Sequence, residues 1–297
     1  MKIDFYKNYL KTKFKEANEY YISGLSDYIE EIDNIYEYKY KNITIRVYYR
    51  KNKDNINISL IKKVIKRASF IYKNKKEIII HLLLTPLRKI IEPNLTSKNV
   101  NSGFTYINDN HIFIYRKEDF PKVILHELIH HDFYIHKDDV KSENESKLKD
   151  FFILDNNSKF ILNEAIVELW AFLYHLFFIS NEYQISFKDL FEIELKYSLY
   201  KCNQIFELHK NENGNGNKWK ESSNIYAYII CKTILLMNIR ELIKIYSFPY
   251  NDTHITSFII KNGKLPPIVK TNPYIYINGT RIQRDDNSLC FMLLSDL

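Results

Sequence analysis

His126, Glu127 and His130 form the pattern H-E-x-x-H, which sets two imidazoles and one carboxylate at helical spacing. Residues i and i+4 share one face of a helix, so both imidazoles can bind one Zn²⁺. Glu127 lies about 100° further round the helix, where its carboxylate can act as general base on a water beside the metal. The pattern therefore predicts a catalytic site with one zinc ion per chain.

A third ligand is expected because a catalytic zinc takes three protein ligands and leaves one position for water. Glu164 and Glu168 supply two carboxylates four residues apart in an apolar stretch that predicts a second helix. We interpret Glu164 as the metal ligand and Glu168 as the carboxylate that accepts the free N–H of His126 and orients its ring. The alternative is that both are solvated charges, which the apolar surroundings disfavour.

His136 offers a different third ligand, because HELIHHDFYIH is similar to the metzincin pattern H-E-x-x-H-x-x-G-x-x-H. The glycine of that pattern lets the chain turn out of the helix in a conformation that is disfavoured for bulky residues. Phe133 stands at the glycine position here. We therefore favour Glu164 and keep His136 as the alternative.

The elements around the motif must hold it in place. Asp119 and Pro121 are suited to the start of a helix, and the apolar residues that follow surround both histidines. The preceding stretch, Gly103 to Arg116, has two apolar arms around Asn-Asp-Asn and predicts a β-hairpin. This hairpin is either the strand along which a substrate pairs or a plain sheet edge.

The rest of the chain separates into a mixed first half and a helical second half. The first half contains amphipathic helices, a short strand near residues 44–49 and a buried strand near residues 77–84. The second half predicts helices near 160–180, 186–209 and 222–246, and a hairpin at Asn278-Gly279. We therefore expect a mostly helical α+β fold with a small sheet. Its N-terminal sub-domain, residues 1–140, ends in the H-E-x-x-H helix, and residues 141–297 form the helical sub-domain.

H-E-x-x-H followed on a later helix by N-E-x-x-x-[D/E] resembles the gluzincin metallopeptidases over residues 101–235. The resemblance implies a zincin-like fold and assigns roles to matching positions: metal ligands His126, His130 and Glu164, general base Glu127, and supporting acid Glu168. It also implies a tyrosine that donates to the oxyanion, either Tyr226 or Tyr228. The chain has no G-x-M-E-N motif, so exopeptidase activity does not follow from the resemblance.

A second resemblance rests on the run NSGFT, IYRKEDF and HELIHH, which is similar to metallopeptidase-like proteins of large DNA viruses. The expected function is zinc-dependent hydrolysis of peptide bonds in a protein or peptide substrate. The same residues could hydrolyse another amide or an ester. The alternative from a different class is an inactive, metallopeptidase-like structural or binding protein, such as a virion component.

Composition narrows the partners and the location. The 43 basic and 36 acidic residues give a net charge of only +7 and are mixed along the chain, so no specific nucleic-acid partner is expected. The most apolar run, residues 169–179, is shorter than the roughly 20 residues of a membrane span. Three scattered cysteines without a C-x-x-C pair, and a start that lacks the apolar core of a signal peptide, predict an intracellular protein in cytoplasm, host cytoplasm or virion.

Overall fold

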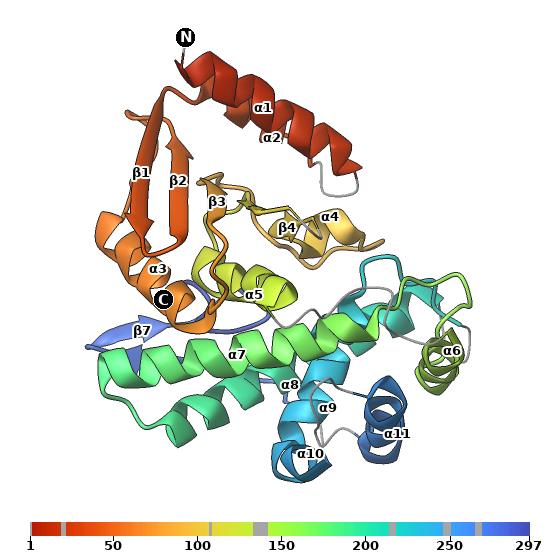
Figure 1. Ribbon diagram of the computed structural model, residues 1–297. Helices are drawn as coiled ribbons and strands as arrows, with labels where there is room; N and C mark the ends of the chain where they lie inside the picture. Colours follow the sequence, from red (N-terminus) through yellow and green to blue (C-terminus); the bar gives the residue numbers. More distant parts are fainter. Residues whose placement is uncertain are drawn as a thin grey trace. The chain divides into compact units, whose positions relative to one another are not determined.

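The computed structural model describes residues 2–18, 22–106, 109–132, 142–213, 218–245, 251–264 and 269–297. The protein is α+β with 53% helix, which confirms the predicted mostly helical class. The chain divides into two compact units (Figure 1). Unit 1 comprises Met1–Lys89, Asn101–Tyr134 and Ser295–Leu297, and unit 2 comprises Ile90–Val100 and Ile135–Leu294. The expected boundary at residue 140 lies outside the described residues.

Unit 1 is built on a mixed five-stranded sheet of order β1-β2-β3-β5-β4. The strands are β1 (Asn34–Tyr40), β2 (Ile43–Tyr49), β3 (Ile78–Leu83), β4 (Gly103–Thr105) and β5 (His111–Ile114). The central pairs β2–β3 and β3–β5 are parallel, whereas both outer pairs are antiparallel. The antiparallel pairing of β4 with β5 confirms the hairpin predicted before the H-E-x-x-H helix.

Helices cover both faces of this sheet. Ile43, Ile45 and Val47 of β2 point to one face, where they pack with α3 (Ile58–Ile71) and α5 (Phe120–Asp132). Tyr48 belongs to the other face, which is covered by α1 (Lys2–Glu16) and α2 (Leu25–Glu31). The period of two along a strand produces this division.

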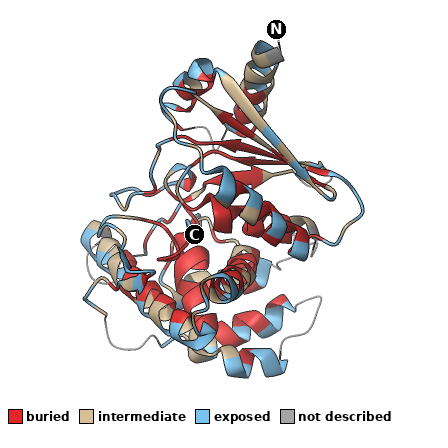
Figure 2. Ribbon diagram, turned by 90° about the vertical axis from the view of Figure 1, so that its left-hand side faces the viewer, coloured by how far each residue is buried: buried red, intermediate tan, exposed pale blue. Residues whose placement is uncertain are grey.

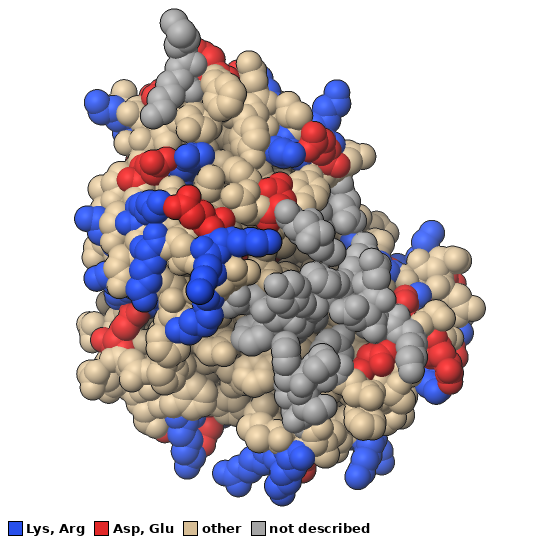
Figure 3. All heavy atoms as spheres, in the orientation of Figure 1, with Lys and Arg blue, Asp and Glu red and all other residues tan. Residues whose placement is uncertain are grey.

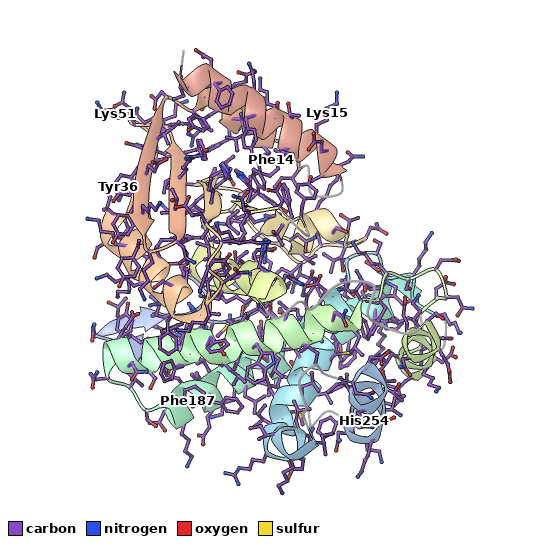
Figure 4. The ribbon with its side chains drawn as sticks, viewed as in Figure 1. Phe14, Lys15, Tyr36, Lys51, Phe187 and His254 are labelled. Atoms are coloured by element: carbon purple, nitrogen blue, oxygen red, sulfur yellow. The ribbon has the colours of Figure 1, made fainter. Side chains whose placement is uncertain are left out.

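The attachment of α1 is mainly aromatic. Figure 4 shows Phe14 pointing from α1 toward the sheet, and its ring meets Phe104 edge-on at a centroid distance of 5.2 Å. Phe14 also packs edge-on against Phe113 and Tyr115. Figure 2 shows the resulting buried stretches along the strands of the sheet.

In the described residues of unit 2, the regular secondary structure is helical apart from one small hairpin. Its helices are α4 (Ser97–Val100), α6 (Ser142–Phe151), α7 (Leu162–Tyr183), α8 (Phe187–Asn213), the π-helix η3 (Tyr226–Cys231), α9 (Lys232–Met237), α10 (Ile239–Ile245) and α11 (Asp252–Asn262). The hairpin joins β6 (Ile275–Ile277) to β7 (Thr280–Ile282) through Asn278 and Gly279, with φ of 50° and 77°. Two positive φ angles are what a two-residue hairpin turn requires, so the Asn-Gly prediction is confirmed.

The helix α7 forms the centre of unit 2. Among the described residues it is the single helix long and apolar enough to cross a membrane, yet 72% of its most apolar window is buried. The core helix of a globular unit has the same properties. The expected helix over 222–246 is divided into η3, α9 and α10, with Asn238 between the last two.

An irregular segment, residues 289–294, is also fully buried in unit 2. Side chains from the helices bond its backbone. Glu194 of α8 accepts the N–H groups of Leu293 and Leu294 at 2.9 and 2.7 Å. The Lys232 ammonium donates to the carbonyl of Phe291 at 2.8 Å. Charged side chains thus replace the hydrogen bonds that a helix or sheet would supply.

The described surface carries both signs of charge. On the face shown in Figure 3, basic and acidic side chains both occur, and several Lys and Arg side chains lie next to one another. Many are paired, as in the exposed contact between Lys39 and Glu77 at 2.5 Å. This arrangement agrees with the mixed charge pattern of the sequence.

Candidate functional site

The helix α5 carries the H-E-x-x-H motif and begins directly after Asp119. The backbone carbonyl of Asp119 accepts the N–H groups of Lys122 and Val123 at 3.1 and 3.0 Å, as an N-terminal cap residue does. Its side chain does not follow the expected capping role. One carboxylate oxygen pairs with the Lys89 ammonium at 2.7 Å, and both side chains are at most 2% exposed. A buried ion pair therefore fixes the start of the motif helix.

The two histidines lie one helical turn apart, as their spacing predicted. The ring centroids of His126 and His130 are 5.0 Å apart and their planes meet at 69°. His126 is 8% exposed and His130 is intermediate, while the neighbours Leu125, Leu128 and Ile129 are buried completely. Two imidazoles are thus held at the rim of an apolar helix, which suits a metal ligand pair.

Glu127 is 6% exposed, although it carries a carboxylate. It lies between the two histidines in the chain and belongs to the same helix. This environment is compatible with the predicted role as general base.

The carboxylate pair lies in unit 2, in the first two turns of α7. Glu164 is partly buried and occupies the first turn, where the helix dipole favours negative charge. Glu168 is completely buried. Glu168 is therefore not a solvated surface charge, as the alternative interpretation required.

The start of α7 is held by a residue that the sequence did not single out. Ile161 precedes the helix and has no side chain able to cap it. Instead, Asn224 accepts the Ile161 N–H through Oδ1 at 2.7 Å, and Asn224 itself has a φ of 67°. Asparagine tolerates this left-handed conformation better than most residues, and that preference was the available sequence signal.

Both candidate oxyanion donors lie on η3 and are engaged within unit 2. Tyr226 is 1% exposed and its hydroxyl is 2.8 Å from Nδ1 of His209. Burial raises the pKa of Tyr226 above the usual range. Tyr228 is 8% exposed and stacks on Phe291 at a centroid distance of 5.1 Å. The choice between the two tyrosines remains a prediction.

The strand β4 ends the sheet of unit 1, so one of its edges has no strand partner among the described residues. Gly103 opens this strand in a confined position. A Cβ atom there would lie 2.6 Å from Cδ1 of Ile114 and 2.9 Å from the Phe113 carbonyl. Only glycine fits without movement, which explains its place in the hairpin. Substrate pairing along β4 stays a prediction.

The metzincin-like alternative depends on Phe133 and His136, which lie outside the described residues. His131, which adjoins His130, is placed at 2.5 Å from Oγ1 of Thr105 on β4. This contact agrees with a structural role for His131.

Comparisons with protein-family models, curated proteins and solved structures gave no match to this chain. The resemblances to gluzincins and to viral metallopeptidase-like proteins therefore rest on the motifs alone.

Proposed function

We propose that this protein is a zinc-dependent peptidase of the gluzincin type, with a zincin-like arrangement of sheet, motif helix and helical C-terminal part. The observation that carries the proposal is the pair of imidazoles on α5, with centroids 5.0 Å apart on an otherwise buried helix and Glu127 between them. A chance H-E-x-x-H need not lie on such a helix.

The ligand set is His126, His130 and Glu164. Each offers one ligand atom: an imidazole nitrogen from each histidine on α5 and a carboxylate oxygen from Glu164 on α7. Two imidazole nitrogens and one carboxylate oxygen form a donor set that zinc accepts in hydrolases, with the fourth position left for water. The donor chemistry fits one zinc ion per chain.

Zinc in such a site supplies a Lewis acid that acidifies water and polarises a carbonyl. The chain's own residues would do the rest of the work. Glu127 would accept a proton from the attacking water and pass it to the leaving amine. Glu168 would orient His126 by accepting its second N–H. Tyr226 or Tyr228 would donate to the oxyanion.

The proposed substrate is a protein or peptide, and the proposed location is intracellular. Cys202, Cys231 and Cys290 are buried and form no disulfide within the described part of the chain, which is compatible with a reducing compartment.

Metal analysis of the purified full-length protein tests the site. We expect about one zinc per chain in the wild type, and loss of zinc in the His126→Ala, His130→Ala double variant. Glu164→Ala should weaken zinc binding strongly and His136→Ala should not. His254→Ala is the matched control, because His254 is exposed on α11. Zinc retained by the double variant would refute the ligand assignment, and the reverse result for Glu164 and His136 would favour the metzincin-like site.

Catalysis is tested separately with Glu127→Gln, which keeps the size of the side chain but removes its proton acceptor. Zinc content should persist while turnover falls by about 10²-fold or more. New peptide termini in a cell extract, compared between wild type and variant, provide the readout. If both proteins hold zinc and give the same termini, the protein is better explained as an inactive structural or binding protein.

A further inference from the structure

A row of polar side chains crosses the interior of unit 1 between α1 and the sheet. Tyr48 of β2 contacts His81 of β3, with 2.8 Å between Oη and Nδ1. Nε2 of His81 is 2.8 Å from Nδ1 of His111 on β5. The hydroxyl of Tyr9 on α1 reaches the same Nδ1 at 3.2 Å. Tyr48 and His81 are completely buried, and His111 is partly buried.

We infer that Tyr9, Tyr48, His81 and His111 form a pH-sensitive lock, which holds α1 on the sheet while both imidazoles are neutral and loosens it when His111 binds a proton. The inference is independent of the proposed peptidase activity and rests on unit 1 alone.

In the neutral state one arrangement of protons gives every contact a donor and an acceptor, with the lone pair on Nδ1 of His111 shared by two donors. The Tyr48 hydroxyl has no other hydrogen bond among the described residues, so it donates to Nδ1 of His81. Neutral His81 then carries its proton on Nε2 and donates to Nδ1 of His111. Nδ1 of His111 is therefore the acceptor at the end of the row, and it also receives the Tyr9 hydroxyl.

A proton on Nδ1 of His111 reverses this order. His81 would have to become the acceptor at Nε2 and carry its proton on Nδ1, facing Tyr48. The buried Tyr48 hydroxyl would then lose its acceptor, which costs free energy. Tyr9 could then only accept from His111, and the single N–H on Nδ1 cannot serve both the Tyr9 oxygen and Nε2 of His81. One protonation thus reverses both donations to Nδ1 and leaves one proton for two contacts, one of which ties α1 to the sheet.

The surroundings do not favour an imidazolium. Burial lowers the pKa of His81 well below 6.5, with further lowering by His111 and Arg46. Burial also lowers the pKa of His111, which Asp109 partly offsets while Arg46 and Lys13 add to the lowering. On α1, Glu16 contacts Lys13, and on β1, Glu37 accepts from Arg46 at 2.6 Å. Glu16 and Glu37 are thus paired with Lys13 and Arg46 near the histidine pair.

The sign of the effect follows from the lowered pKa values. A histidine whose pKa is lower in the folded state contributes stability that is present above its ordinary value of 6.5. That contribution is lost as the pH falls through the folded-state value. Acid should therefore loosen α1, whose remaining attachment is the apolar contact around Phe14.

Hydrogen–deuterium exchange on the full chain tests the lock. After correction for intrinsic exchange, protection of the α1 amides should fall about tenfold between pH 7.5 and pH 5. Protection of α3, on the opposite face of the sheet, should change little. In His111→Gln, which cannot titrate, the loss in α1 should disappear. His254→Gln on α11, labelled in Figure 4, is the control and should behave as wild type.

Equal losses in wild type and His111→Gln, or no loss in wild type, would overturn the inference. If His111→Gln does not fold, nitrogen NMR of the wild type decides instead. At pH 8 His81 should carry its proton on Nε2, and a signal from the Nδ1–H form would contradict the lock.

Discussion

The two units use their buried charges in different ways. In unit 1 the buried Lys89 pairs with Asp119 at 2.7 Å and the partly exposed Arg50 pairs with Asp54 at 2.9 Å. The buried Arg116 is an exception, since it donates to the Asn101 carbonyl at 3.0 Å. In unit 2 buried charges bond the main chain. Glu194 holds the N–H groups of Leu293 and Leu294, and Lys201, whose pKa burial lowers to about 8, donates to the Asp286 carbonyl at 3.2 Å.

The backbone explains this difference. Unit 1 places most of its buried chain in a sheet and helices, whose own hydrogen bonds leave few main-chain groups to satisfy. Unit 2 buries an irregular segment, residues 289–294, whose N–H and C=O groups need other partners. The buried pair of Lys89 and Asp119 in unit 1 therefore lies at the start of a helix, whereas the buried charges of unit 2 substitute for secondary structure.

The largest expected effect is in unit 1. Lys89→Met would leave the Asp119 carboxylate, which is 1% exposed, without its cation in the interior. We expect the free energy of unfolding to fall by about 3–5 kcal/mol, measured by urea denaturation. Lys39→Met removes a lysine from an exposed pair and should have no measurable effect. A loss below about 1 kcal/mol for Lys89→Met would break the comparison, since it would show that unit 1 does not depend on its buried pair.

The second effect concerns pH and unit 2. Burial raises the pKa of Glu194 to about 7 from an ordinary 4.5, because its bonds to two N–H groups only partly offset the lost solvation. A raised carboxyl pKa contributes stability that is fully present below pH 4.5 and is lost as the pH rises through about 7. The contribution is on the order of 3 kcal/mol.

Glu194→Gln should therefore remove part of the stability decrease between pH 5 and pH 8, which urea denaturation at both pH values would reveal. Glu192→Gln, on the exposed side of the same helix, is the matched control. An unchanged pH dependence in Glu194→Gln would show that its carboxyl does not titrate in this window. Because the histidine pair of unit 1 loses stability in the opposite direction, the two units should be jointly most stable near neutral pH.

A smaller effect is expected at the start of α7. Asn224→Ala removes the acceptor of the Ile161 N–H and places alanine at a φ of 67°. The cost should be about 1–2 kcal/mol in unfolding free energy. Asn224→Gly removes the acceptor without the backbone strain, so its smaller loss would separate the two causes. If the proposed zinc site is correct, both variants should also weaken zinc binding, because Glu164 lies in the first turn of α7.

The sequence predicted the elements that have strong local signals. The hairpin at Asn278-Gly279 follows from two residues that accept positive φ, and the strand β3 follows from a dense run of Ile and Leu ending before Pro86. The position of α5 follows from Pro121 and the apolar residues around the two histidines. These signals lie within a few residues of what they specify.

Polar contacts between residues that are distant in the sequence have no such local signal. Nothing near Lys89 in the sequence indicates Asp119, and nothing near His81 indicates Tyr48 or His111. The strand β1 was also missed, although the tyrosines of NIYEYKY alternate with charges, which is the period of a half-buried strand. Pairing across a sheet depends on register, which residue types alone do not determine.

Residues 90–100 belong to unit 2, although they lie in the chain between the parallel strands β3 and β5 of unit 1. A single cleavage of the chain therefore cannot produce one fragment for each unit. A recombinant fragment ending near residue 132 would carry Leu95 and Val100, at most 3% exposed in the whole protein, without the unit that covers them. Such a fragment should aggregate. To produce unit 1 separately, residues 90–100 would have to be replaced by a short polar loop.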